Sequence, residues 1–366
     1  MTLTCHWFLP TYGDSRDLVG GGHGTDLTAS GGDRPATLGY LGQIVRAAEQ
    51  LGFVGVLTPT GAWCEDAWLT TAMLVSESER LKFLVAFRPG LISPVLAAQM
   101  SATFQRHSAG RLLLNIVTGG EDAEQRAYGD FYSKNERYER TDEFLGIVRE
   151  LWTGAEVDFK GHHLQVERAR LTSVPDPLPT VYFGGSSAAG RAVAARHVDV
   201  YLTWGEPPDA VAAKIESVRA AAAEQGRTMR FGIRLHVIAR DTEEQAWAEA
   251  DRLLAALDPA AIAEAQSGLV RSQSEGQQRM IALHGGRTDH LEIHPNLWAG
   301  VGLVRGGAGT AMVGSHEQVA DLMERYNRIG VDEFILSGQP HLEEAYRFGE
   351  GVLPVLRRRG LWAPPA

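Results

Sequence analysis

The chain has 366 residues and a formal net charge of −10, from 35 basic and 45 acidic side chains. An acidic balance without any run rich in Lys and Arg argues against a nucleic-acid-binding surface, so no nucleic-acid partner is expected. Its two cysteines exclude a disulfide framework. The N-terminus lacks a signal-peptide pattern, and no apolar run approaches the roughly 18 residues of a membrane span. We therefore expect a cytoplasmic protein with no membrane partner.

Short apolar runs alternate with amphipathic stretches along the whole chain. Strands are predicted over residues 3–9, 53–57, 82–87, 112–117, 181–183, 198–203, 230–240 and 333–336. Helical periodicity follows every strand but the first closely, at residues 65–75, 94–107, 137–152, 190–196, 210–225, 243–257 and 341–356. Further helices are predicted over residues 37–51, 261–272, 276–284 and 317–329, with a hairpin at 157–166.

Repeated βα units of this spacing imply a parallel α/β sheet, and about eight of them indicate a (β/α)8 TIM barrel with insertions. A doubly wound open sheet is the alternative, but no G-x-G-x-x-G motif follows any predicted strand. We expect a single domain over residues 1–366. It carries a glycine-rich mobile loop at about residues 13–35 and an insertion region at about residues 258–316.

The stretch Arg230–Arg240, RFGIRLHVIAR, is an unusual strand because its apolar alternation is interrupted on one face by Arg234 and His236. Burying a cation costs several kcal/mol unless an anion meets it. Two interpretations follow. Either this is an edge strand with both side chains solvated, or it is a buried strand whose polar face lines an anion-binding active pocket.

Polar and glycine residues follow almost every predicted strand, where barrel enzymes place their active sites. The segment 182–187, YFGGSS, precedes a helix, so its backbone N–H groups and hydroxyls suit a phosphate, although Ser187 could equally serve as a helix cap. Arg305 in VRGGAGTA could bring a charge over a pocket, while a surface arginine is the commoner case. The default interpretation of Cys64 is a small buried thiol. No histidine has ligand-like spacing with carboxylates, so no metal is expected.

Several segments resemble the FMNH2-dependent alkanesulfonate monooxygenases of the bacterial-luciferase-like flavin family, over most of residues 3–356. They include WFLPTYGD, TPTGAWCEDAW, YFGGSS, RFGIRLHVIAR, LWAGVGLVRGGAGTA and PHLEEAYR. The resemblance implies a luciferase-like barrel that receives reduced FMN from a separate NAD(P)H-dependent FMN reductase. It also implies that O2 is the co-substrate and that a flavin peroxide desulfonates an alkanesulfonate to an aldehyde and sulfite, for sulfur acquisition. A homotetramer or homodimer is expected.

The resemblance also assigns residues to the site. The catalytic pocket would contain Arg234, His236, Arg305, His341, Cys64 and Trp204. The phosphate of FMN would lie on Gly185, Ser186 and Ser187, with Asn115, Thr118 and Tyr138 nearer the other end of the flavin. Arginines suit a permanent anion such as a sulfonate, and either histidine could move the proton that carbon–sulfur cleavage requires.

One position departs from the family pattern. The family usually has a tyrosine before the Pro-His of this motif, whereas this chain has Gln339. A carboxamide has no titratable proton to give, so the acid of the reaction would be missing or moved. The alternatives are therefore a luciferase-like flavin or deazaflavin oxidoreductase acting on another organosulfur or small substrate, or a catalytically impaired barrel that binds FMN or a sulfonate.

Overall fold

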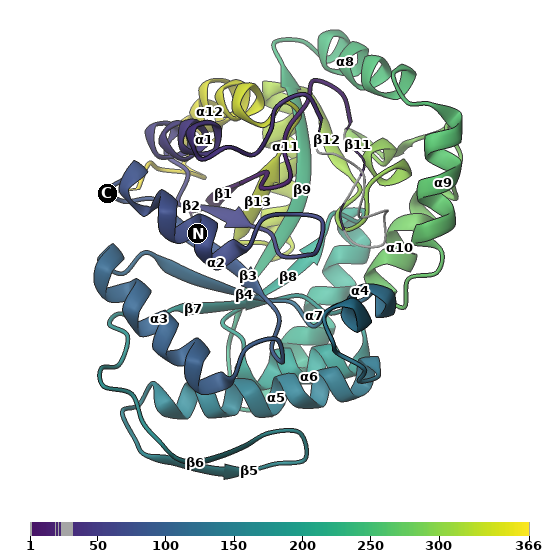
Figure 1. Cartoon of the computed structure of the whole chain (residues 1–366). Helices are drawn as coiled ribbons and strands as arrows, with labels where there is room; N and C mark the ends of the chain where they lie inside the picture. The colour runs from purple at the N-terminus through teal and green to yellow at the C-terminus, as the bar shows by residue number, and fades with distance from the viewer. Residues whose placement is uncertain (1, 19, 21, 23–31, 366) are drawn as a thin grey trace.

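The computed structural model describes residues 2–18, 20, 22 and 32–365. Eight parallel strands form a closed barrel, and each pairs with its two neighbours (Figure 1). In order around the barrel they are β1 (Thr4–Phe8), β2 (Gly55–Thr58), β3 (Lys82–Phe87), β4 (Leu112–Ile116), β7 (Thr180–Phe183), β8 (Val200–Trp204), β9 (Arg230–Arg240) and β13 (Glu333–Ser337). These are the eight strands predicted from the sequence, so the (β/α)8 fold is confirmed.

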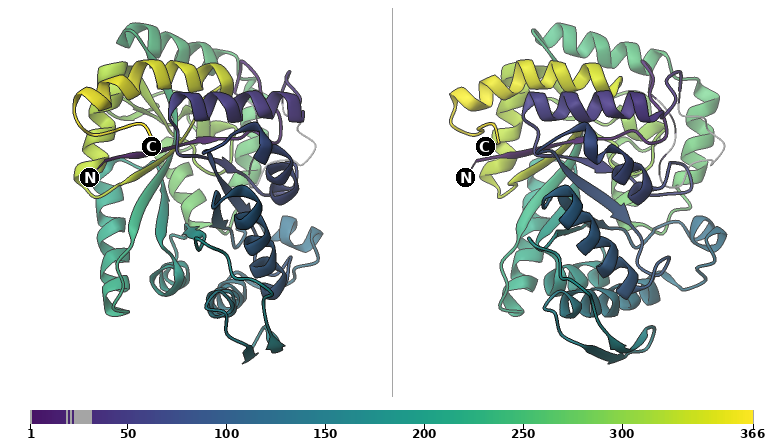
Figure 2. Two further views of the ribbon diagram at one scale, coloured as in Figure 1. Left: turned by 90° about the vertical axis from the view of Figure 1, so that its left-hand side faces the viewer. Right: turned by 60° about the vertical axis from the view of Figure 1, so that its left-hand side comes forward.

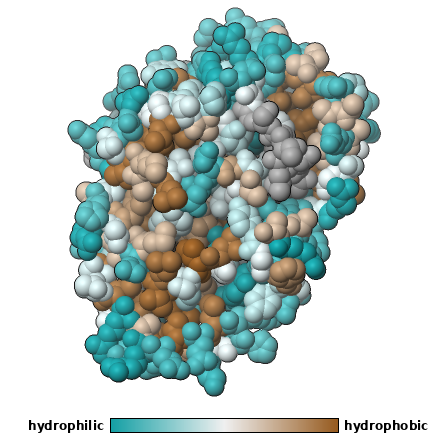
Figure 3. Space-filling model, viewed as in Figure 1, coloured by the Kyte–Doolittle hydropathy of each residue, from teal (hydrophilic) through white to brown (hydrophobic). Residues whose placement is uncertain are grey.

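Helices surround the barrel and connect its strands (Figure 2). They are α1 (Leu38–Leu51), α2 (Ala67–Leu74), α3 (Pro94–Ser108), α4 (Asp122–Ala127), α5 (Lys134–Leu151), α6 (Ala188–His197), α7 (Pro208–Glu224), α8 (Glu243–Ala255), α11 (His316–Arg328) and α12 (His341–Arg358). Figure 3 shows apolar side chains on the face that α2 and α3 form, where Leu69, Met73 and Leu96 are exposed. The hairpin of β5 (Val157–Lys160) and β6 (Gln165–Ala169) projects beyond α5, and it too was predicted.

The barrel interior is filled by a layer of inward-pointing side chains. Phe8, Leu57, Leu113 and Ile335 belong to one buried apolar cluster, to which Leu84, Tyr182 and Val200 also contribute. Successive side chains of a strand point to opposite faces. Asn115, two positions after Leu113 on β4, therefore points inward above this layer, whereas Phe334, one position before Ile335 on β13, points outward to the helices. The layer closes the barrel and provides the floor of the space above it.

Strand β9 has the two faces predicted for it. Phe231, Ile233 and Leu235 belong to the large core between the strands and the outer helices. On the other face, the Arg234 guanidinium lies over the Phe8 ring, 4.6 Å from its centroid, inside the barrel. The edge-strand interpretation is wrong, since β9 pairs with β8 on one side and β13 on the other.

The region between α8 and α11 covers the carboxyl ends of the barrel strands. It contains α9 (Pro259–Leu269), α10 (Glu275–His284), β10 (Glu292–His294), β11 (Leu297–Trp298) and β12 (Ala311–Ser315). Strand β12, which sequence periodicity missed, pairs in parallel with the second half of β9, from His236 to Arg240. The first half of β9 pairs with β8, so this long strand carries both the barrel and the insertion. Residues 19, 21 and 23–31 of the predicted loop at residues 13–35 lie outside the described residues.

Candidate active site

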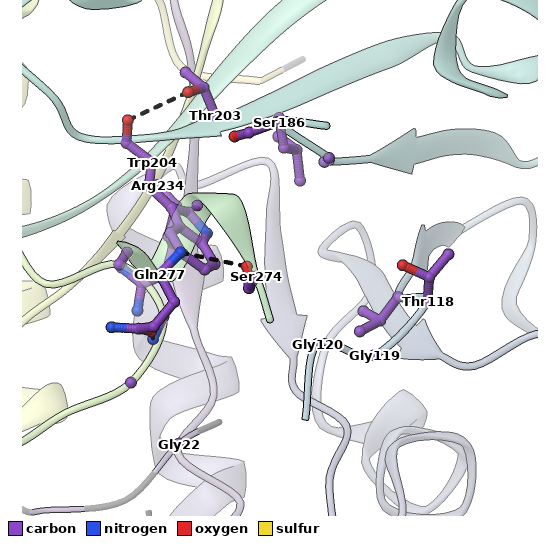
Figure 4. A pocket seen from close by; sticks show the side chains of 18 of the residues that line it. Gly22, Thr118, Gly119, Gly120, Ser186, Thr203, Trp204, Arg234, Ser274 and Gln277 are labelled. Carbon is purple, nitrogen blue, oxygen red and sulfur yellow. Dashed lines mark hydrogen bonds between the residues drawn. The ribbon is translucent and has the colours of Figure 1, made fainter. Parts of the chain in front are cut away.

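A cavity opens at the carboxyl ends of the strands, between the barrel mouth and α10. Nine of the site residues suggested by the sequence line it, namely Asn115, Thr118, Tyr138, Gly185, Ser186, Ser187, Trp204, Arg234 and Arg305. Figure 4 shows Arg234 and Gln277 on one side of this space, Thr118 with Gly119 and Gly120 on the opposite side, and Ser186 between them. Segments distant in sequence therefore meet at one site.

Arg234 is a buried cation that no carboxylate neutralises. Its guanidinium donates to Leu235 O at 2.7 Å and to Ser337 Oγ at 2.8 Å, and its side chain is within the barrel. In the described part of the chain no acidic oxygen lies within ion-pair distance of it. Burial, with a further contribution from the nearby Arg305, lowers the pKa of Arg234 to about 9, so it stays cationic at neutral pH.

Arg305 is the second cation on this side of the cavity, and only 5% of its surface is exposed. We call the side of the cavity formed by Arg234 and Arg305 the arginine wall. Its guanidinium lies against three aromatic rings, 4.5 Å from the centroid of Tyr12, 5.8 Å from Trp63 and 5.9 Å from Phe8. Arg305 Nη1 is buried and has no hydrogen-bond partner. An unsatisfied buried donor costs roughly 1–3 kcal/mol. This donor of Arg305, together with the charge of Arg234 that no carboxylate among the described residues neutralises, indicates a place for an anion at the cavity.

The loop before α6 forms a close backbone cradle. A Cβ on Gly184 would lie 2.7 Å from Leu202 O, and one on Gly185 would lie 3.2 Å from Gly190 Cα, so only glycine fits both positions well. Ser187 caps α6 by accepting a hydrogen bond from Gly190 N at 3.1 Å, which agrees with the helix-cap interpretation of this residue. The cap leaves the loop lining the cavity at a helix N-terminus, where the helix dipole favours an anion such as a phosphate.

Cations reinforce this cradle. Arg191 Nη1 donates to Ser186 O at 2.5 Å, and Lys214 Nζ, which reaches the cavity wall, donates to Thr203 Oγ1 at 3.0 Å. Glu206 binds both Lys214 and Arg279, so two positive charges share one carboxylate. The local charge therefore stays positive beside the loop. Lys214 was not identified from the sequence, because it becomes part of the site only when the fold brings α7 to Glu206 and α10.

The rest of the cavity suits a flat aromatic ring system. Its floor is made by Phe8, Leu57 and Ile335, and the Asn115 amide stands at its edge because β4 alternates inward at that position. Trp204, the last residue of β8, lies against the first turn of α10, where a Cβ on Gly276 would come 3.0 Å from the indole. An apolar floor, a few polar groups and a phosphate cradle together fit the isoalloxazine and phosphate of FMN.

His236 lies behind the arginine wall and does not line the cavity. Ser337 Oγ accepts from Arg234 and donates to His236 Nδ1 at 2.8 Å, and His236 Nε2 lies 3.2 Å from Ala308 O. Burial, followed by Arg234 and Arg305, holds the pKa of His236 well below its ordinary value. The neutral imidazole thus accepts at Nδ1 and donates at Nε2, which ties β9, β13 and the Arg305 loop together.

His341 is fully buried at the start of α12 and is paired with Asp14. Its Nδ1 lies 2.9 Å from Asp14 Oδ1, and its backbone N–H donates to Asp14 Oδ2 at 2.7 Å. Burial opposes ionisation of Asp14, but His341 and the Tyr40 hydroxyl prevail and lower its pKa. His341 Nε2 has no hydrogen-bond partner, and the ring lies 5.7 Å from the Phe8 ring that lines the cavity. Asp14 was missed because it stands in a polar loop after the first strand.

Cys64 and Gln339 also stand outside the cavity lining. The Cys64 thiol faces Gly61 O at 3.5 Å, and burial raises the pKa of Cys64 to about 12, so it is a neutral thiol. Gln339 is buried, and its Oε1 has no hydrogen-bond partner.

Two loops meet over the cavity and help to enclose it. Gln273 Nε2 donates to Asp122 Oδ2 at 2.6 Å, and Ser272 donates to Glu121. Gln277 Oε1 accepts from Gly307 N at 2.9 Å, which ties α10 to the loop that carries Arg305. The insertion region therefore both roofs the cavity and supplies one of its cations.

Among the described residues, no group of three or more His, Cys, Asp or Glu side chains is arranged to hold a metal ion. Within the same residues, no helix is both long and apolar enough to cross a membrane.

Known proteins match this chain along nearly its whole length. The sequence profile of the luciferase-like monooxygenase family matches residues 6–333. Riboflavin lyase, solved with modified FMN and riboflavin, is 21% identical, with a TM-score of 0.82 over 100% of this chain and 93% of that chain. A long-chain alkane monooxygenase is 18% identical, with a TM-score of 0.78 over 100% and 93% of the two chains. EDTA monooxygenase from Chelativorans sp. BNC1 is 19% identical, with a TM-score of 0.75 over 100% and 96%.

Proposed function

The chain belongs to the luciferase-like monooxygenase family, a family of flavin-dependent enzymes, and we propose that it is an FMNH2- and O2-dependent alkanesulfonate monooxygenase. The observation that carries the proposal is the pair Arg234 and Arg305. Both are buried at one cavity wall, and no carboxylate in the described residues neutralises either. A sulfonate, which stays anionic at every physiological pH, would bring a negative charge and three acceptor oxygens to them.

Reduced FMN would bind with its phosphate at the Gly185–Ser187 loop and its ring system over the apolar floor, beside Asn115, Thr118 and Tyr138. The bound flavin supplies the two electrons with which O2 is activated. The chain's own residues then have three tasks. Arg234 and Arg305 hold the anionic head group, the roof formed by α10 and the Arg305 loop excludes water, and Trp204 orients the ring system from one side.

The reaction balances with these reactants. An alkanesulfonate, O2 and FMNH2 give an aldehyde, hydrogen sulfite, oxidised FMN and water. One oxygen atom enters the aldehyde and the other leaves as water, while a proton is lost from the carbon next to sulfur. His341 does not line the cavity, so we assign it to relaying the proton away from the site, because its Nε2 is unpartnered and Asp14 fixes its ring. His236, with both nitrogens engaged in the wall, is assigned to holding Arg234 and the Arg305 loop in place.

Reduced flavin would come from a separate NAD(P)H-dependent FMN reductase, since the chain has no nicotinamide fingerprint.

We further propose that the chain self-associates as a homodimer or homotetramer through the apolar face of α2 and α3. Leu69 and Met73 lie one helical turn apart there and are exposed to solvent in the single chain, as is Leu96 (Figure 3).

Mixing the protein with photoreduced FMN, oxygen and an alkyl sulfonate tests this function by the release of sulfite. We expect sulfite only when all three are present. Another substrate within the family, such as an organosulfur compound without a sulfonate group, would give oxygen consumption without sulfite from any sulfonate. A deazaflavin enzyme would bind reduced F420 in preference to reduced FMN, which tryptophan fluorescence would detect.

A further inference from the structure

Tyr12 stands beside the arginine wall, in the turn that follows β1. Its ring contacts Trp63 at 5.2 Å and Phe8 at 6.2 Å between centroids, and both of those residues line the cavity. It also lies 6.4 Å from the His341 ring. The phenol is therefore placed where the first strand, the Arg305 loop and α12 come together.

The hydrogen bonding of Tyr12 leaves its proton unused. The Arg305 guanidinium lies over the Tyr12 ring, 4.5 Å from its centroid. A guanidinium has only donors, so Arg305 cannot accept a hydrogen bond from the Tyr12 O–H. The O–H of Tyr12 is then left to point elsewhere, and no acceptor for it lies among the described residues.

The second observation is an unpartnered donor on Arg305. Its Nη1 is buried without a partner, although 95% of the residue is removed from solvent. A phenol O–H and a guanidinium N–H without acceptors among the described residues thus belong to two side chains that are in contact with each other. A ligand oxyanion can accept from both at once, and one with three oxygens can also reach Arg234.

We propose that Tyr12 is a substrate-binding residue that donates its phenolic hydrogen bond to the anionic head group held by Arg305. This inference rests on the proposed function, because it assigns a further recognition group to the same sulfonate. It differs from a general electrostatic role for the arginines, since the phenol is neutral and contributes through a directed hydrogen bond.

The electrostatics keep the phenol in the form that this role needs. Burial raises the pKa of Tyr12, Asp14 raises it further, and Arg305 and Arg234 only partly offset these effects. Tyr12 therefore remains protonated at neutral pH and acts as a donor. Gln339, the residue that stands where the related enzymes usually have a tyrosine, cannot supply a phenol, so Tyr12 supplies the one phenol in contact with Arg305 among the described residues.

Isothermal titration of the apoenzyme with sodium 1-octanesulfonate tests this without any flavin. We expect Tyr12→Phe to weaken binding about 10- to 100-fold, the usual value of a hydrogen bond to a charged group. The control Tyr132→Phe removes a phenol at the protein surface and should bind as the wild type does. Equal affinities of the wild type and Tyr12→Phe would overturn the inference.

A second measurement does not depend on the variant's stability. Alkaline difference absorption of the wild-type apoenzyme follows tyrosine ionisation, and a bound sulfonate that accepts from Tyr12 must move one ionisation to higher pH. No movement on saturation with 1-octanesulfonate would contradict the inference. Binding that depends on Tyr12 without sulfite release would contradict the proposed function alone, whereas sulfite release with equal affinities would contradict the role of Tyr12 alone.

Discussion

Replacing Arg234 by methionine should stabilise the unliganded protein while abolishing sulfonate binding. The fall in the pKa of Arg234 to about 9 corresponds to roughly 5 kcal/mol that disfavours the charged side chain in the folded apoenzyme. The cost arises because burial removes hydration, Arg305 repels the charge, and no carboxylate among the described residues forms a compensating ion pair with Arg234. Methionine has similar length and no charge, so it removes this cost and keeps much of the packing against Phe8.

The gain will be smaller than the electrostatic cost, because Arg234 also donates to Leu235 O and Ser337 Oγ, at 2.7 and 2.8 Å. Losing these bonds leaves two buried acceptors less well satisfied, at about 1–2 kcal/mol in total. We therefore expect Arg234→Met to raise the free energy of unfolding by about 3–4 kcal/mol, which agrees with the usual effect of replacing buried charges by apolar side chains. Urea denaturation of the apoenzyme at pH 7 measures it, and sulfite release measures the loss of function.

Arg240 on the same strand provides the matched control. It is paired through both terminal nitrogens with the buried Glu344, at 2.9 Å each. Arg240→Met should lower the free energy of unfolding by about 2–4 kcal/mol, because it leaves a buried carboxylate with only Arg347 nearby. If Arg234→Met instead destabilises the apoenzyme as much as Arg240→Met does, Arg234 must have an anionic partner in the free protein, which would contradict this expectation.

Three further predictions concern other parts of the site. Asp14→Asn should cost about 2–4 kcal/mol of unfolding free energy at pH 7. Because the folded-state pKa of Asp14 is lowered, that difference should be complete above the ordinary aspartate value and fade below about pH 4, as paired denaturation curves would reveal. Gly185→Ala should weaken reduced FMN binding at least about tenfold by crowding the start of α6. Gly146→Ala, whose Cβ meets nothing within 4 Å, is its control, and equal flavin affinities of the two variants would argue against a phosphate at this loop. Gln339→Tyr should raise the single-turnover rate of desulfonation, and an unchanged or lower rate would remove this position from the chemistry.

The barrel could be predicted because its eight strands are short apolar runs with a strong contrast to the helices between them. Strand β12 could not, since AMVGS is a brief run after a glycine-rich loop and its partner is the second half of β9. The short helix α4 was missed for a similar reason, as DAEQRA has too few turns to show a period. Their existence depends on tertiary contacts that local sequence does not contain.

The site residues that stand on barrel strands could be predicted, because the direction of a strand and the alternation of its side chains determine which residues reach the cavity. Asn115, Trp204 and Arg234 stand on barrel strands, so alternation and the carboxyl-end rule place them at the cavity. Distance from the cavity could not be predicted, which is why His236 and His341 were grouped with the arginines although they lie behind the wall. Tyr12 and Asp14 were not identified, because their importance comes from Arg305 and His341, which are more than 290 residues away in sequence.

Sulfite release in a single turnover tests the central claim most directly. The protein would be mixed with a limiting amount of photoreduced FMN, excess oxygen and a panel of alkyl sulfonates of increasing chain length, with Arg234→Met as the control. We expect sulfite approaching one equivalent per reduced flavin for at least one sulfonate, and none for the control. Complete flavin oxidation without sulfite from any sulfonate, while reduced FMN binds normally, would contradict the proposed function.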